Sequence, residues 1–389
     1  MLCALVMAIV GVDTFGISYV APFLGAEYGM STQRVGLLFT ATVVASLLGA
    51  IGVAPWSDRT GRRSILLLSV LLVGLPGALI ALTSNHAALL ALRFLVGLGF
   101  GASLPVAVAL VSESVTARHR SLAVTVTSSA MVAGMALAGI AASLLIPAFG
   151  WRSMLYASAA LSLVVAFALW LLLPESQLHR DTGPLPAPAA TGARLRGALL
   201  RSLLLGLLLT MSFTVVNFAA YWLPTIILNQ GYSVAETGVI GSSRQVVTVL
   251  FGALLGWCMD RAGVSRVLVF CYLSATLLFF CTAGVSALPV ALGLLLLALS
   301  ALSAGLSGSM VYVSSFYAPA VRATALGWLH GVARVVGGSL GTYVGGVLVG
   351  AGWTQPQLAT FIGCAAAIGA AALIATRYAR FQGAQGVGA

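Results

Sequence analysis

Residues 54–63 read APWSDRTGRR, and residues 256–263, in the second half of the chain, read GWCMDRAG. Both stretches place a glycine two positions after an Asp-Arg pair, and both follow a long apolar segment. A single ungapped register that aligns Asp58 with Asp260 predicts two related halves, because unrelated segments rarely share turn residues and loop charges together. The same register pairs further residues of the two halves: Pro22 with Pro224, Gly29 with Gly231, Gly61 with Gly263 and Arg120 with Arg322.

The composition predicts an integral membrane protein. The chain has 389 residues, of which 60% are hydrophobic and only 7% are charged, whereas soluble domains carry roughly 25% charged residues. Its apolar runs are about 20 residues long, which is enough for a helix to cross a hydrocarbon core of ~30 Å. The period-2 alternation of membrane barrels is absent. The five cysteines have no metal-ligand spacing, so neither a metal nor a cofactor is expected.

The predicted fold is an all-α membrane protein with twelve transmembrane helices in two pseudo-symmetric six-helix bundles. Residues 1–173 form the first bundle and residues 201–389 the second, with a short cytoplasmic tail. Residues 174–200 are rich in Pro, Ala and Gly, which is typical of a flexible cytoplasmic linker. The predicted spans are 2–24, 34–55, 64–84, 87–111, 122–147, 153–173, 201–228, 235–257, 266–285, 288–316, 323–350 and 357–377.

The arginines predict the orientation in the membrane. All basic residues other than histidine are Arg, and they cluster in short connections. If both termini are cytoplasmic, nearly all loop arginines lie inside and only Arg34 and Arg152 lie outside, as the positive-inside rule requires. The net charge of +11 therefore indicates topology and not a nucleic-acid partner. A bacterial inner membrane is the predicted location, and the protein is expected to be a monomer.

Ionisable side chains inside the spans are the candidate functional residues, because each costs about 2.5–3.5 kcal/mol on insertion scales. Asp13 lies near the middle of the first span. Loss of hydration favours its neutral form and a nearby arginine favours its charged form, so Asp13 is predicted to carry a proton. The alternative is a permanent structural ion pair. Arg93 cannot release a proton, but it can influence Asp13 or hold an anion; the alternative is again a buried structural pair.

Three more charged or titratable residues lie in the second half. His330 and Arg334 are four residues apart, so they project from one helical face. Arg334 is predicted to anchor an anion. His330 is a candidate second proton site, although a hydrogen-bonded wall residue is the interpretation we favour. Arg244 lies too deep in its span to reach the outer surface and is a second candidate for the anion site. Further candidates for substrate binding are Tyr19, Asn217, Tyr221, Gln245 and Trp328; for the aromatic ones, packing or interfacial positions are the alternative.

With these residues in view, the chain resembles the aromatic acid:proton symporter family within the major facilitator superfamily. The paired Asp-Arg loops resemble the superfamily's loop motif. Closer matches to the family are GVDTFG in the first span, RFLVGLGFGASLP (93–105) running into LVSESVTARHR, YWLPTIIL (221–228), LLGWCMDR (254–261) and FYAPAVRATALGWLHGVARVVG (316–337).

The resemblance implies proton-driven uptake of small aromatic carboxylates such as hydroxybenzoates. It assigns function to Asp13, Arg93, Glu113, Arg322 and Arg334, with Glu113 grouped with the proton-coupling residues. The chain departs from the family pattern at Val10, Val106 and Arg244, which favours a differently placed or more highly charged anion. The loops are predicted to form a conformational latch made of Asp58, Arg59, Arg62, Asp260, Arg261 and Arg322.

Two other classes of transporter remain as alternatives. One is a proton-coupled symporter of another organic or sugar acid. The other is a drug:proton antiporter, which is less favoured because residues 128–145 lack the Gly-Pro pair of such proteins and because intramembrane arginines suit anions. An enzyme is not expected, since the sequence has no catalytic triad pattern, metal-ligand cluster or nucleotide-binding loop.

Overall fold

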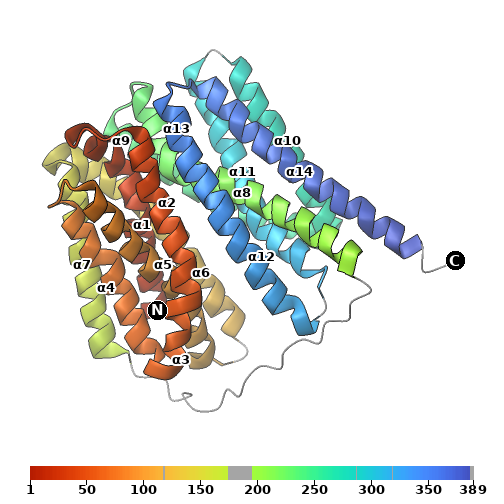
Figure 1. Cartoon of the computed structure of the whole chain (residues 1–389), viewed down its shortest axis with the longest axis horizontal. Helices are drawn as coiled ribbons and strands as arrows, with labels where there is room; N and C mark the ends of the chain where they lie inside the picture. Colours follow the sequence, from red (N-terminus) through yellow and green to blue (C-terminus); the bar gives the residue numbers. More distant parts are fainter. Residues whose placement is uncertain (117–118, 174–194, 286, 318, 386–389) are drawn as a thin grey trace. The chain divides into compact units, whose positions relative to one another are not determined.

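The computed structural model describes residues 1–116, 119–173, 195–285, 287–317 and 319–385, and every regular element in these residues is a helix (Figure 1). Within these described residues, twelve helices are long and apolar enough to cross a membrane, by length and composition. The predicted number of spans and the all-helical class are therefore confirmed.

The helices of the first half follow the predicted spans closely. The exception is the second span, where α2 gives way to a π-helical turn (Gly49–Val53) and a 3-10 turn (Ala54–Trp56). Pro55 lies in that 3-10 turn, where its missing backbone N–H can be accommodated. The bounds are α1 (Leu2–Glu27), α2 (Thr32–Leu48), α3 (Ser57–Thr60), α4 (Arg62–Ile80), α5 (His86–Ser114), α6 (Arg120–Phe149) and α7 (Trp151–Leu172).

The second half repeats this plan. Its second span opens on a capping box, in which the Glu236 carboxylate accepts from the Ser233 backbone N–H at 2.8 Å and the Ser233 hydroxyl accepts from the Glu236 N–H at 3.2 Å. The bounds are α8 (Leu195–Asn229), α9 (Val234–Ala262), α10 (Val264–Gly284), α11 (Leu288–Ser314), α12 (Pro319–Ser339), a π-helical turn (Leu340–Val344), α13 (Gly345–Gly350) and α14 (Gln355–Gln385).

Backbone conformation shows the internal repeat. Every residue with positive φ is a glycine among those described, as expected where the chain turns into a left-handed conformation. These glycines form pairs at equivalent places in the two halves, including a pair that the sequence comparison did not single out. The pairs are Gly29 (58°) with Gly231 (90°), Gly61 (93°) with Gly263 (88°), and Gly150 (80°) with Gly352 (75°).

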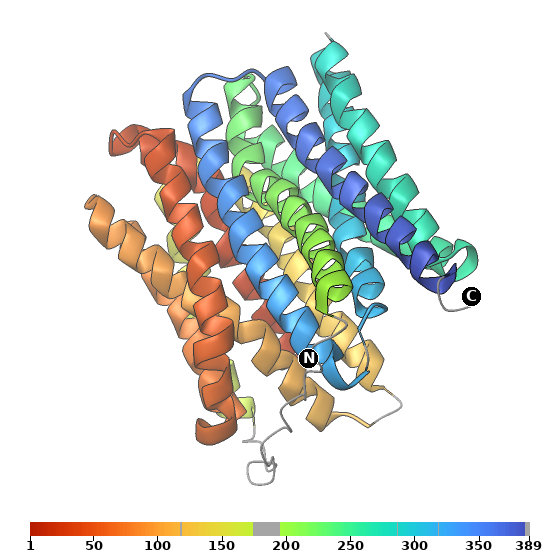
Figure 2. The ribbon, with the colours of Figure 1, turned by 45° about the vertical axis from the view of Figure 1, so that its right-hand side comes forward.

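The chain contains two compact units. In unit 1, α1 packs against α6 and α7, α4 against α5 and α7, and α2 against α5 (Figure 1). In unit 2, α10 packs against both α11 and α14 (Figure 2). The predicted linker falls largely in 174–194, outside the described residues, so the division into two six-helix domains stays a prediction. Unit 1 comprises Met1–Thr182, Ala220–Val246 and Thr342–Gly350, and unit 2 comprises Gly183–Ala219, Val247–Gly341 and Ala351–Ala389.

A close approach between α1 and α6 sets the orientation of α1. Any side chain at Gly11 would overlap the carbonyl oxygen of Met131, and any side chain at Gly134 would overlap that of Ala8. Small residues allow helix backbones to approach in this way. With this face of α1 held against α6, the carboxylate of Asp13, two residues after Gly11, contacts α4 and α7 instead.

Candidate functional site

Asp13 is buried inside unit 1, with 5% of its surface exposed. The Ser158 hydroxyl of α7 donates a hydrogen bond of 2.7 Å to its Oδ2 atom. On the α4 side, a Cβ atom at Gly77 would lie 3.2 Å from the same oxygen. The carboxylate therefore lies among α1, α4 and α7, in a buried position where a charge is costly unless it is neutralised or hydrogen-bonded.

Arg93 of α5 lies beside Asp13 and is 1% exposed. Its Nη2 atom donates to the Thr14 carbonyl oxygen at 3.4 Å, and its electrostatic neighbours are Asp13 and the Tyr221 phenol. No ion pair within 4.0 Å joins Asp13 to Arg93, both of which are described. The Nε atom of Arg93 and the hydroxyl of Thr14 are buried without a hydrogen-bond partner. Asp13 and Arg93, which were both predicted to take part in proton coupling, are thus adjacent but do not form an ion pair.

Tyr19, Arg244 and Gln245, all predicted to bind substrate, also belong to unit 1. Arg244 and Gln245 of α9 are each 6% exposed, and Arg244 acts electrostatically on the Tyr19 hydroxyl. The Tyr19 hydroxyl packs against Gly241, and a Cβ atom at position 241 would overlap it. A buried guanidinium beside a phenol can bind a carboxylate with charge-assisted hydrogen bonds.

Aromatic rings form a cluster around Tyr221, which is 1% exposed. Its ring centroid lies 4.6 Å from that of Phe39 and 5.6 Å from that of Phe15. Phe15 in turn meets Phe100 edge-on at 6.0 Å. Tyr221 was predicted from the sequence as a candidate for substrate binding, but Phe39 and Phe100 were not. Phenylalanine is common in apolar spans, and the sequence does not indicate which other rings it contacts.

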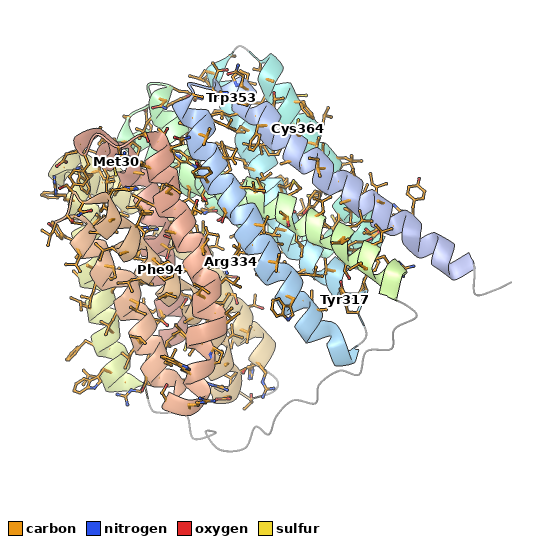
Figure 3. All side chains as sticks on the ribbon, in the orientation of Figure 1. Met30, Phe94, Tyr317, Arg334, Trp353 and Cys364 are labelled. Atoms are coloured by element: carbon orange, nitrogen blue, oxygen red, sulfur yellow. The ribbon has the colours of Figure 1, made fainter. Side chains whose placement is uncertain are left out.

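The candidates of the other half lie in unit 2. His330 meets the Phe213 ring edge-on at 5.1 Å. Arg334 lies half-buried one turn further along α12 (Figure 3), and it acts on His330 electrostatically. The Asn217 amide donates to the Phe213 carbonyl oxygen at 2.9 Å, within its own helix. Trp328 is 72% exposed. Substrate-binding roles for these residues stay predictions.

The predicted latch is described only in part. Arg62, at the start of α4, forms an ion pair with Glu113, near the end of α5. Glu113 is about 30 Å along α5 from Arg93, at roughly 1.5 Å per residue, and therefore lies with the latch residues rather than near Asp13. The Arg261 guanidinium lies 3.8 Å from the Trp257 ring centroid, while Asp260 and Arg59 are exposed. The side chains of Asp58 and Arg322 lie outside the described residues.

Sequence reasoning missed Ser158 and Gly77, the two residues in contact with the Asp13 carboxylate. A serine in an apolar helix usually donates to its own backbone, as Ser69 does to the Ile65 carbonyl oxygen at 2.8 Å. The pair Ser158 and Ser162, one turn apart on α7, was a possible signal of a polar helix face.

The chain is similar to known proteins over nearly its whole length. A family model described as Major Facilitator Superfamily matches residues 3–341. A 4-hydroxybenzoate transporter of Pseudomonas aeruginosa is 32% identical, over 96% of this chain and 91% of its own length. A gallate transporter of Pseudomonas putida is 29% identical, over 98% and 92% respectively. Among solved structures, a D-xylose-proton symporter has a TM-score of 0.78 at 17% identity, covering 96% of this chain and 95% of its own; this likeness concerns the fold alone.

Proposed function

The chain belongs to the Major Facilitator Superfamily, and from this premise we propose that it imports a small aromatic carboxylate of the hydroxybenzoate type together with protons, by alternating access. Its family and its relatives are transporters, so the chain is a multi-pass membrane transporter and not an enzyme. The family predicted from the sequence is confirmed. Proton coupling, substrate and mechanism are our proposal.

The observation that carries the proposal is the burial of Asp13 beside Arg93 without an ion pair between them. A permanently paired carboxylate could not exchange its proton easily. Asp13 instead has one neutral hydrogen-bond donor and a guanidinium nearby, so its charged and neutral forms are both supported. Arg93 stays charged throughout and keeps the site attractive to an anion when Asp13 is protonated.

Energetics supports the coupling. Import of an anion against an inside-negative potential costs about 2.3 kcal/mol per charge per 100 mV. A proton that moves with the anion cancels this charge, and the inward proton gradient can then drive accumulation. Asp13 is the residue we assign to that proton.

The proposed anion is bound by buried guanidinium groups. In unit 1, Arg244 and Tyr19 offer one charged and one neutral donor side by side, and the rings around Tyr221 provide apolar walls of the kind that suits an aromatic substrate. We further propose substrate-contact roles for Gln245 in unit 1 and for Arg334, Asn217 and Trp328 in unit 2. His330 stays a candidate for a second proton site, and a wall residue is the interpretation we favour. The relatives named as 4-hydroxybenzoate and gallate transporters favour a phenolic carboxylate over a sugar acid.

We also propose that the chain lies in a bacterial inner membrane as a monomer, with both termini cytoplasmic. The Asp-Arg loops then face the cytoplasm, where the Arg62–Glu113 ion pair joins the ends of α4 and α5. A contact of this kind suits a latch that is made and broken during the transport cycle.

The test of this function is Asp13→Asn in purified protein reconstituted in liposomes. Accumulation of 4-hydroxybenzoate driven by an inward proton gradient should fall to background, whereas counterflow exchange, which needs no net proton movement, should persist. Glu236→Gln is the matched control, because an exposed carboxylate is lost while the capping box is kept. Gradient-driven accumulation by Asp13→Asn would refute the proposal, and so would a folded mutant that had lost counterflow.

A further inference from the structure

The Asp13 carboxylate is held by two residues that the proposed function does not itself require. Ser158 donates to Oδ2 at 2.7 Å from α7, and Gly77 brings the α4 backbone against the carboxylate from the other side. We propose that Ser158 and Gly77 are positioning residues for proton transfer, which fix the orientation of the Asp13 carboxylate and set the pH at which it gains and loses its proton. This inference rests on the proposed function of Asp13.

The chemistry of a serine hydroxyl suits this task. It has one proton to donate and two lone pairs to accept with, so Ser158 can donate to the charged carboxylate and still contact the protonated acid. Because Asp13 is 5% exposed, water offers little replacement for this bond. Loss of the hydroxyl therefore destabilises the charged form more than the neutral form.

Gly77 acts sterically, because its missing side chain leaves room for the Asp13 carboxylate, and not through a hydrogen bond. A Cβ atom at this position would lie 3.2 Å from Oδ2 and 3.5 Å from Oδ1 of Asp13. The shorter distance is tighter than an ordinary van der Waals contact, so even an alanine methyl group would displace the carboxylate away from α4. Displacement changes the distance to Ser158, on which the hydrogen bond depends.

Few other groups can set the proton affinity of Asp13. Arg93 of α5 is the one charged side chain that acts on it in the described part of the chain. The neighbouring helix α4 contributes Gly77, α7 contributes Ser158, and α6 meets this part of α1 through Gly134. None of these three residues titrates, so a change in the pH dependence after substitution at 77 or 158 can be assigned to Asp13.

Ser162 provides the matched control. It lies one turn beyond Ser158 on α7, is 1% exposed, and its hydroxyl has no hydrogen-bond partner. It faces Gly74 of α4, just as Asp13 faces Gly77. Ser162→Ala therefore removes an equally buried hydroxyl from the same helix pair without touching Asp13.

The experiment measures proton-driven uptake and counterflow as a function of external pH in liposomes. Ser158→Ala should move the half-maximal pH of uptake upward by about one unit, the size expected for one lost hydrogen bond, because Asp13 keeps its proton to higher pH. Ser158→Thr, which retains a hydroxyl, should restore the wild-type profile, and Ser162→Ala should match it. Gly77→Ala should lower the ratio of uptake to counterflow.

The outcomes separate this inference from the proposed function. If Asp13→Asn abolishes uptake but Ser158→Ala keeps the wild-type profile, the positioning role is refuted and the function stands. If Asp13→Asn leaves uptake intact, the proposed function itself fails. If Ser158→Ala does not fold, Gly77→Ala tests the positioning role in its place. An unchanged ratio of uptake to counterflow in Gly77→Ala then overturns the inference.

Discussion

At the scale of single residues, burial of charge is the dominant constraint. Arg93 and Arg244 are almost fully buried, and each has exchanged the hydration of a guanidinium for a few protein contacts. The desolvation of an ion costs several kcal/mol even after relaxation. Such a cost is sustained where the charge has a role, and the role that we propose for Arg244 is to bind the anionic substrate.

Arg244→Gln tests the role of the buried guanidinium. Removal of one charge-assisted contact should weaken binding of 4-hydroxybenzoate by about 1.5–3 kcal/mol, which corresponds to roughly a 10- to 100-fold rise in Kd. The neutral analogue 4-hydroxybenzaldehyde should lose far less. Thermal-shift titration of the purified protein with both compounds measures the difference. Equal losses for the two ligands would assign Arg244 a structural role.

The residues that could be predicted are those whose chemistry conflicts with the membrane. Asp13 and Arg93 stand out in apolar spans, and the structure brings them together. Ser158 and Phe39 could not be predicted, because serine and phenylalanine are ordinary in such helices and their partners are distant in sequence. Glu113 was grouped with Asp13 by resemblance, whereas its observed partner is Arg62.

At the scale of helices, close packing in unit 1 depends on missing side chains. The Tyr19 hydroxyl fills the position of the absent side chain at Gly241 of α9, and Gly139 of α6 and Gly238 of α9 meet backbone to backbone. The Ser242 hydroxyl donates to the Ala136 carbonyl oxygen at 2.7 Å along the same contact between α6 and α9. Tyr19 is therefore fixed in place beside Arg244 by helix packing.

Gly241→Ala should disturb this packing. The new methyl group overlaps the Tyr19 hydroxyl, and overpacking of this kind costs about 1–3 kcal/mol. Gly252→Ala on the same helix is the matched control, since it meets no atom within 4 Å and should be neutral or stabilising. Thermal unfolding in detergent compares the two. Tyr19→Phe, which removes the clashing oxygen, should recover part of the loss; no recovery would place the strain elsewhere.

The number and position of the membrane-spanning helices could be predicted better than the irregular turns within them. The length of the apolar runs predicted the twelve spans, whereas the capping box of Ser233 and Glu236 at the start of α9 was not predicted. The π-helical turns at Gly49–Val53 and Leu340–Val344 were not predicted. Within these turns, side chains at Gly49 and Gly341 would overlap the backbone oxygens of Leu98 and Thr214 respectively. Tight packing against another helix is absent from any local sequence pattern.

At the scale of the whole molecule, the two halves of the chain resemble each other in both sequence and backbone conformation. Paired glycines with positive φ end corresponding helices in both halves, yet the polar content of the halves differs. Asp13 has no acidic counterpart, since Val215 stands at the equivalent position. Unit 2 contains instead a neutral hydrogen-bonded group, in which the Tyr272 hydroxyl contacts Ser212 at 2.6 Å and Ser309 at 3.0 Å. The two halves therefore share a backbone plan, while the buried acid among the described residues lies in the first half.

This asymmetry predicts the electrical character of transport. The chain has eight acidic residues, and Asp13 is the buried one among those described. One carboxylate carries one proton, so import of a monovalent benzoate with one proton moves no net charge. In liposomes, a pH gradient alone should drive accumulation of 4-hydroxybenzoate, and a valinomycin-induced potassium potential alone should not. Accumulation driven by the potential would require a second proton, and if His330 carried it, His330→Gln would abolish the response to the potential while leaving the response to the pH gradient.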